Sequence, residues 1–132
     1  MIKVSFDFDG TLSLEYVQEF AKKLLDRNIE IWIVTAREEG ISHNLDLYKV
    51  ASELQIPNDR IIFTNYEDKY PKLNLINALF HLDDDVIELS MIKDYSKTIP
   101  ICHLEWGVQY GGRFKWREII LKLINESDNS GE

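Results

Sequence analysis

The sequence predicts an α/β fold, a doubly wound and mostly parallel sheet of five strands with helices on both faces. Short apolar runs of strand length alternate along the 132 residues with longer segments in which apolar residues recur every three or four positions. That alternation is typical of a parallel sheet with crossover helices. Polar and charged side chains follow the apolar runs, at the strand ends where such sheets bind ligands.

Five apolar runs are expected to form the strands. Residues Ile29–Val34 give the clearest one, because a continuous apolar run is expected of a central strand buried on both faces. With helices between them, the five strands predict a Rossmann-like domain. The strands are expected at Lys3–Phe8, Ile29–Val34, Arg60–Phe63, Phe80–Leu82 and Ile99–Leu104.

Amphipathic segments between the strands are expected to form the helices. Ser13 is placed to cap the first helix, and Pro71 suits the first turn of the third. The second helix must stop before Pro57, which disfavours a helical residue ahead of it. The helices are expected at Leu14–Asn28, His43–Gln55, Pro71–Leu79, Val86–Asp94 and around Trp116–Ile124.

Size and composition limit the domain count and the location. With 45% hydrophobic residues the chain can bury one core, so residues 1–126 are expected to form a single domain and 127–132 a polar C-terminal tail. The net charge of −8 disfavours long-range attraction to polyanions. The start MIKVSFDFDG is charged, unlike a signal peptide, and no run reaches the roughly 18 apolar residues of a membrane span. Cys102, the single cysteine, cannot form an internal disulfide, so we expect a cytoplasmic protein without membrane contact.

The segment FDFDGTL, Phe6–Leu12, places two carboxylates where the first strand ends. Asp7 and Asp9 are two residues apart, and Gly10 allows the chain to turn away sharply. One carboxylate can attack phosphorus, while a second can protonate the leaving oxygen and then activate water. Both steps need a cation. The alternative interpretation is two loop acids beside a glycine turn.

This segment resembles motif I, DxDGT, of phosphatases of the haloacid dehalogenase (HAD) superfamily. The resemblance implies that Asp7 is the nucleophile and a metal ligand. It implies that Asp9 is the general acid and base and binds the metal through its backbone carbonyl. Thr11 would help to shape the substrate-binding loop.

The second strand ends in IVTAR, Ile33–Arg37, which looks like motif II of the same superfamily. The resemblance gives Thr35 the role of gripping the transferring phosphate, with the Ala36 amide as a second donor. Arg37 could clamp substrate phosphate with two hydrogen bonds. The alternatives are ordinary turn chemistry for Thr35 and an exposed loop arginine for Arg37.

The superfamily also requires a lysine that neutralises the nucleophile and the phosphate. Lys69 and Lys72 flank Pro71 before the third helix, and both could be plain surface lysines. The segment TNYEDK, Thr64–Lys69, resembles the TNGxxK-like segments of small HAD members. Lys69 is therefore preferred as the catalytic lysine, and Lys72 is kept as a substrate-binding candidate.

The segment HLDDDVIEL, His81–Leu89, is similar to motif IV, whose acids complete the magnesium site. Aligned by strand ends, Asp84 matches the direct metal ligand, Asp83 would lie in the outer shell or orient a bound water, and Glu88 matches a second acid. Oxygen ligands alone suit Mg²⁺. Asp85 is interpreted as a helix N-cap. The neighbouring His81 is interpreted as structural.

The loop Glu105–Trp116 combines aromatic residues and glycines with Arg113 beyond the fifth strand. It could stack a nucleobase and bind substrate through Arg113, or it could simply pack on the last helix. The sequence leaves both alternatives open.

The spacing of the motifs leaves no room for the cap domain of larger HAD members. Only 25 residues separate Asp9 from Thr35, and 33 separate Thr35 from Lys69. We therefore expect an open site unless a second subunit of a homo-oligomer covers it. VTAREEG followed by paired aspartates partly resembles the phosphatase domain of polynucleotide kinase-phosphatase, although Asp85 stands where an arginine is expected.

These features predict an enzyme, a Mg²⁺-dependent phosphomonoester hydrolase that acts on a phosphorylated substrate such as a nucleotide or a nucleic-acid end. A response-regulator receiver domain is a weaker alternative, because its phosphorylated aspartate lies on a later strand and it lacks DxDGT. A catalytically silent HAD-like domain that binds a metal or a partner is the stronger alternative.

Overall fold

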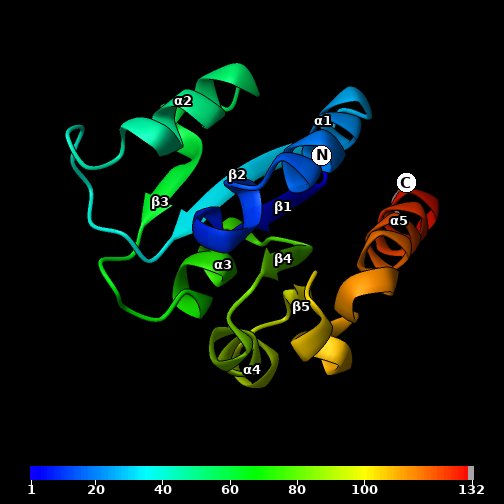
Figure 1. The fold of residues 1–132 in the computed structure, drawn as a ribbon. Helices are drawn as coiled ribbons and strands as arrows, with labels where there is room; N and C mark the ends of the chain where they lie inside the picture. Colours follow the sequence, from blue (N-terminus) through cyan, green and yellow to red (C-terminus); the bar gives the residue numbers. More distant parts are fainter. Residues whose placement is uncertain (131–132) are drawn as a thin grey trace.

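Five short parallel strands form the centre of the computed structural model, which describes residues 1–130 (Figure 1). The strand order is β3-β2-β1-β4-β5, and every neighbouring pair is parallel. This arrangement confirms the Rossmann-like α/β prediction. The strands are β1 Lys3–Phe6, β2 Glu30–Thr35, β3 Ile61–Phe63, β4 Phe80–Asp83 and β5 Ile99–Cys102.

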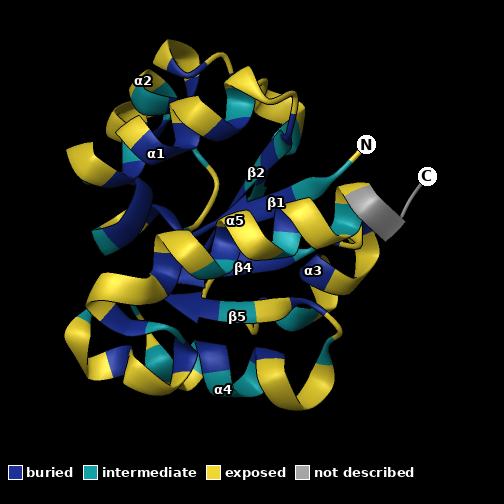
Figure 2. Cartoon of the chain, turned by 90° about the vertical axis from the view of Figure 1, so that its right-hand side faces the viewer, coloured by how far each residue is buried: buried dark blue, intermediate teal, exposed yellow. Residues whose placement is uncertain are grey.

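Helices cover both faces of the sheet. Side chains of α1, α2 and α5 pack into one hydrophobic cluster, and those of α3 and α4 pack into another. Figure 2 shows the buried strands between helices whose outer surfaces are exposed. The helices are α1 Glu15–Asp26, α2 Leu45–Glu53, α3 Tyr70–Ile76, α4 Val86–Tyr95 and α5 Gly112–Ser130. None of the helices within residues 1–130 combines the length and the apolar character needed to cross a membrane.

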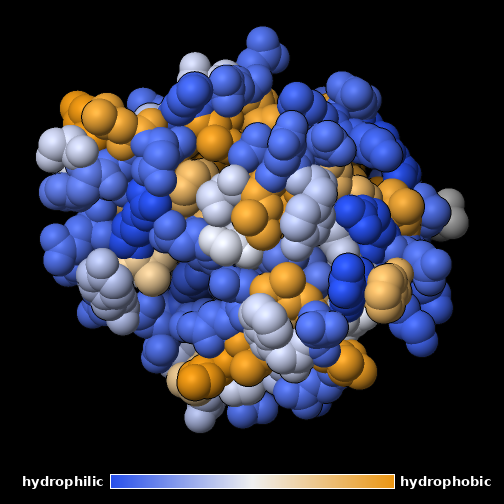
Figure 3. Space-filling view, viewed as in Figure 1, coloured by the Kyte–Doolittle hydropathy of each residue, from blue (hydrophilic) through white to orange (hydrophobic). Residues whose placement is uncertain are grey.

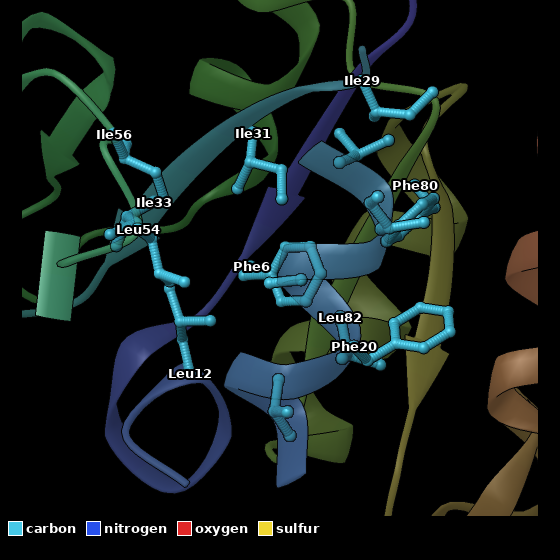
Figure 4. Packing of buried hydrophobic residues seen from close by; sticks show 14 of the residues in the cluster. Phe6, Leu12, Phe20, Ile29, Ile31, Ile33, Leu54, Ile56, Phe80 and Leu82 are labelled. Carbon is cyan, nitrogen blue, oxygen red and sulfur yellow. The ribbon is translucent and has the colours of Figure 1, made fainter. Parts of the chain in front are cut away.

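The alternation of side chains along β2 explains why its four central residues, Ile31 to Val34, are all apolar. Ile31 and Ile33 belong to the first cluster, whereas Trp32 and Val34 pack with the second. Figure 4 shows Ile31 and Ile33 on the same side of the sheet as Phe20 of α1. A fully buried side chain of this size stabilises the fold by about 1.5–3 kcal/mol, so both layers depend on this strand.

The strand order changes direction beside β1. Strands β2 and β3 follow β1 to one side, and β4 and β5 lie on its other side. Phe6 pairs with Ile33 and with Leu82, and the Asp7 N–H donates to the Leu82 carbonyl at 2.9 Å. The residues after Phe6 and Leu82 therefore meet at one edge, at the switch point where folds of this kind bind ligands.

Several element boundaries differ from the sequence prediction. Strand β1 ends at Phe6, because the chain turns at once into an irregular helical turn, Phe8–Leu12, in which Gly10 has φ 69°. Ser13 does not cap α1; its hydroxyl accepts a hydrogen bond from the Gly10 N–H at 3.1 Å. The Asp85 N-cap is confirmed, since its carboxylate accepts from the amides of Ile87 and Glu88.

The C-terminal segment also differs from its prediction. Helix α5 continues through Ser130, so residues that were expected to form a polar tail are helical as far as the structure describes them. Residues 131–132 of that tail lie outside the described part. Strand β5 ends at Cys102, two residues earlier than expected.

Candidate functional site

Three carboxylates meet at the carboxyl ends of β1 and β4. Asp7 follows β1, Asp83 is the last residue of β4, and Asp84 comes next. One oxygen from each lies within 4.8 Å of the others. Asp7 and Asp83 are buried and Asp84 is partly exposed, so the group opens to solvent on the Asp84 side. We call these three residues the acidic cluster.

One buried ammonium group joins two members of the acidic cluster. Lys69 Nζ donates to Asp7 Oδ1 and to Asp83 Oδ2, both at 2.8 Å. Lys69 precedes α3, and its backbone N–H donates to Glu88 Oε1 at 2.6 Å. Lys72 is exposed on α3. The structure therefore brings Lys69 and not Lys72 into contact with the cluster, and Glu88 contacts the Lys69 backbone.

Asp83 is saturated with hydrogen bonds. Its Oδ2 accepts from Lys69 and from His81 Nε2 at 2.7 Å, and its Oδ1 accepts from the amides of Asp84 and Asp85. Burial alone would raise the pKa of Asp83, but the Lys69 ammonium and the His81 hydrogen bond hold that pKa far below its usual range. These contacts favour the ionised form of Asp83, whose two oxygens both accept hydrogen bonds from within the protein.

His81 orients Asp83 from behind. Its Nδ1 lies 2.8 Å from the Ser5 hydroxyl, and burial lowers the pKa of the ring. A neutral ring that accepts from Ser5 at Nδ1 and donates to Asp83 from Nε2 satisfies both contacts. The prediction that His81 is structural did not include this bond. The signal was present in the sequence, because residues 81 and 83 of one strand face the same side.

Asp7 and Asp84 are less well paired with positive charge than Asp83. Burial raises the pKa of Asp7, and the charge of Asp83 raises it further, against the opposing effect of Lys69. Burial also raises the pKa of Asp84. Three carboxylates around one ammonium group leave an excess of negative charge that a divalent cation would neutralise.

The turn after β1 is shaped to fit Asp84. Gly10 adopts a positive φ, and a methyl group on it would lie 2.4 Å from Asp84 Oδ2. A larger residue would therefore be strained and would push Asp84 away. The donor set of carboxylate oxygens, with Asp7 and Asp84 close together and open to solvent on one side, fits a hard cation such as Mg²⁺.

Thr35 and Ala36 lie at the same edge of the sheet, one strand away from Asp7. Thr35 ends β2 and is buried, and its hydroxyl accepts from the Arg37 N–H at 3.3 Å. Backbone hydrogen bonds from Thr64 and Tyr66 to the carbonyls of Thr35 and Ala36 fix the chain there. The two candidate phosphate donors are thus on a rigid segment.

Arg37 is engaged within the protein. It donates to both oxygens of Asp9, at 2.9 and 2.7 Å, and to both oxygens of Asp46, at 2.8 and 2.9 Å. A further donor faces Asn44 Oδ1 at 3.3 Å, and the guanidinium lies over the Phe8 ring. Arg37 therefore has no pair of free N–H donors for a substrate phosphate in this structure. The Asp9 carboxylate, 59% exposed, faces Arg37 and is outside the acidic cluster.

Thr11 is held from the end of β5. His103 Nε2 lies 2.9 Å from the Gly10 carbonyl and 3.2 Å from the Thr11 hydroxyl, and its Nδ1 contacts the Tyr16 hydroxyl. Burial lowers the pKa of His103, so its Nε2–H donates to Gly10 and its Nδ1 accepts from Tyr16. This chain of contacts connects α1 and β5 to the turn.

Beyond β5 the residues that follow the strand line a pocket of about 450 Å³ together with residues of α1 and α5. Trp106 Nε1 donates to the Asp84 carbonyl at 3.1 Å, which joins the lining of the pocket to the acidic cluster. Trp116 and Tyr110 are buried, whereas Trp106 and Phe114 are exposed, so part of the segment Glu105–Trp116 packs and part faces solvent. Arg113 lies at the start of α5 beside this pocket and not at the acidic cluster. The lining residues are Tyr16, His103, Leu104, Glu105, Trp106, Arg113, Phe114, Trp116 and Arg117.

Sequence reasoning missed four residues that complete these arrangements. Spacing gives no sign of them, because each reaches the site from a different loop or helix. They are Tyr16, Asp46, His103 and Arg117. No protein-family model matches the sequence, and no curated protein shows significant similarity to it.

Proposed function

We propose that the protein is a Mg²⁺-dependent phosphomonoester hydrolase of the HAD type that works through an aspartyl phosphate on Asp7. One observation carries the proposal. Lys69 Nζ bridges Asp7 and Asp83 at 2.8 Å, with Asp84 alongside, at the switch point of the sheet. A buried carboxylate, held by an ammonium group and close to a second carboxylate that can bind a cation, is equipped to attack phosphorus.

The chemistry then follows from two aspartates. An Asp7 oxygen attacks phosphorus while the bond from phosphorus to the leaving oxygen breaks. Asp9, which takes up a proton from solvent once its carboxylate has left Arg37, gives that proton to the leaving oxygen and later takes one from the water that attacks the aspartyl phosphate. Inorganic phosphate leaves, and both carboxylates are restored. For this role the Asp9 side chain must turn away from Arg37, which its exposed position permits.

The surrounding groups balance charge. Lys69 stabilises the negative charge of the phosphoryl group, and Asp83 orients Lys69. Thr35 and the Ala36 amide donate to phosphoryl oxygens. Mg²⁺, when held by Asp7, Asp84 and the Asp9 carbonyl, supplies positive charge that polarises the phosphoryl group.

The proposed enzyme has no cap domain. Within residues 1–130 a single α-helix connects each strand to the next, which supports the proposal of an enzyme without a cap. Selectivity then comes from the rim or from a second subunit. We propose nucleotides or phosphorylated nucleic-acid ends as substrates, and the net charge of −8 favours short ones.

A catalytically silent metal-binding domain is the second candidate. The observation that favours it is the double clamp of Arg37 on Asp9 and Asp46, which keeps the proposed acid away from the acidic cluster. Such a protein would bind Mg²⁺ without turnover.

Hydrolysis of p-nitrophenyl phosphate separates the two candidates. We expect Mg²⁺-dependent turnover that falls by about 10³-fold or more in Asp7→Asn and in Asp9→Asn, with the fold intact. Asp59→Asn, at an exposed site before β3, is the matched control and should match the wild type. Full activity in folded Asp7→Asn would falsify the nucleophile assignment.

A further inference from the structure

We infer that the pocket between Trp106, Phe114 and Tyr16 is a subsite for a planar aromatic ring that carries a second phosphate, as in a nucleoside bisphosphate. This inference rests on the proposed function for the first phosphate, which reacts at Asp7. The pocket supplies what the acidic cluster lacks, namely aromatic surface and positive charge.

The aromatic surface is open to a ligand. Trp106 is 62% exposed and Phe114 is 83% exposed, although both are large hydrophobic residues in contact with the pocket. Figure 3 shows hydrophobic and strongly hydrophilic side chains side by side over the first turns of α5. A flat ring stacked on these side chains would cover apolar surface that water now contacts.

The positive charge is concentrated and poorly compensated. Arg27, Arg37 and Arg60 each have a carboxylate within 3.7 Å. Within residues 1–130, Arg117 forms no ion pair, and Arg113 reaches only Glu105 at 3.9 Å.

Arg117 is held in place by rings instead of acids. Its guanidinium lies 4.3 Å from the Trp116 ring centre and 5.8 Å from that of Tyr16. These cation–π contacts leave the N–H groups of Arg117 without a carboxylate partner among the described residues, and a guanidinium in this state can bind a phosphate with two hydrogen bonds. In a chain of net charge −8, Arg117 without an acid partner in the described part and Arg113 with a long contact to Glu105, both beside one pocket, favour an anionic ligand.

Two hydrogen bonds link the lining of the pocket to the segments that carry the acidic cluster and its turn. Trp106 contacts the Asp84 backbone, and His103 contacts the Gly10 carbonyl. A ligand with one phosphate at Asp7 would, on this proposal, extend past the Asp84 backbone to the aromatic residues of the pocket. A sugar phosphate lacks the ring, and a nucleoside monophosphate lacks the second anion.

Binding and turnover are measured separately to test this. Isothermal titration of Asp7→Asn protein with adenosine 3′,5′-bisphosphate, adenosine monophosphate and ribose 5-phosphate should give affinities in that descending order. Trp106→Ala and Arg117→Ala, added to Asp7→Asn, should each weaken bisphosphate binding about tenfold or more. Trp106→Phe should retain most of the affinity. Arg27→Ala, a paired arginine at the end of α1, is the control and should change nothing.

The outcomes distinguish the subsite from the proposed function. If the bisphosphate binds no better than ribose 5-phosphate, or if neither Trp106→Ala nor Arg117→Ala weakens it, the subsite is wrong even where p-nitrophenyl phosphate is hydrolysed. If binding follows the expected order but wild-type protein hydrolyses no phosphomonoester, the subsite stands and the hydrolase proposal falls. Tighter binding of a 3′-phosphorylated hexanucleotide than of the bisphosphate would contradict the preference for a short ligand.

Discussion

Two ion networks hold the two aspartates of the segment FDFDG, and they differ most in burial. Asp7 belongs to a buried network with Lys69, Asp83 and His81, whose side chains are all less than one-tenth exposed. Asp9 belongs to a surface network with Arg37 and Asp46, in which both acids are more than half exposed. Asp7 is therefore held in place, whereas Asp9, two positions further on, can move.

This difference matches the roles that the proposed mechanism assigns. A nucleophile must be fixed, and buried charges that lose their partners are strongly destabilising, so Asp7 has no alternative position. A group that first donates a proton and then accepts one must move, and surface ion pairs break at a cost of about 1 kcal/mol or less. The contrast can be tested by removing one member of each network.

The largest effect is expected for Asp83. Asp83→Asn replaces the oxygen that accepts from the buried Lys69 ammonium and from His81 with a donor group, so it should lower the free energy of unfolding by about 3–5 kcal/mol. Asp7→Asn removes a buried charge whose pKa is raised, so stability should be unchanged or higher. Urea unfolding at neutral pH without divalent cations measures both, with Asp59→Asn as reference. Equal losses for Asp83→Asn and Asp7→Asn would show that the two acids are equivalent.

A Mg²⁺ titration compares the contributions of Asp84 and Asp83 to metal binding. Asp84→Ala should weaken Mg²⁺ binding by more than about 100-fold, because it removes a proposed ligand. Burial raises the pKa of this carboxyl group, so its charged form gains from a nearby cation. An Asp83 variant that remains folded should lose less, about tenfold, since Asp83 acts through Lys69. The opposite ranking would remove Asp84 from the proposed ligands.

The affinity for a cation should depend on pH in a direction that the raised pKa of Asp7 determines. A cation binds the charged form of Asp7, and burial raises the pKa of that group, so below the raised pKa each binding event must expel a proton. Mg²⁺ affinity should therefore fall as the pH is lowered through that range. Calorimetry in buffers of different ionisation enthalpy detects the released proton. Asp7→Asn should abolish the release, and a release that persists in this variant would assign it elsewhere.

Without a cation, Asp7 and Asp83 should make the stability of the protein depend on pH in opposite directions. The raised pKa of Asp7 contributes stability that is present at low pH and lost as the pH rises through it. The lowered pKa of Asp83 contributes stability that is present at neutral pH and lost as the pH falls. Comparing unfolding curves of Asp7→Asn and wild type across acidic pH isolates the first contribution, which should be missing in the variant.

The smallest effect is expected in the surface network. Asp46→Asn should lower the free energy of unfolding by less than about 1 kcal/mol, and added salt should reduce the difference further. A loss of several kcal/mol would mean that Arg37 holds the Asp9 turn as firmly as Lys69 holds Asp7.

The order of helices and strands could be predicted from sequence because the apolar pattern of each element is local. The same holds for the Asp85 cap and for the position of Lys69 ahead of the third helix. The irregular turn at Phe8–Leu12 was not predicted, since a five-residue window cannot show that Ser13 bonds back to Gly10.

The partners of the site residues depend on how strands and loops are joined. His81 hydrogen-bonds to Ser5 because strand pairing places the two residues opposite each other, and pairing register cannot be read from either strand alone. Asp46 reaches Arg37 across a loop of irregular conformation. Chemistry at the strand ends was therefore predictable by residue type, whereas the hydrogen bonds that restrain it were not.

The position of β1 between β2 and β4 also bears on how the chain folds. Ser5 and His81, which hydrogen-bond across the β1–β4 junction, are 76 residues apart. Closing so long a loop is slow, and parallel pairing brings no stabilising contacts until the loop is closed. A growing chain that has not reached β4 offers Asp7 neither Asp83 nor the β4 backbone. The two halves of the sheet must therefore join before the buried ion network can exist.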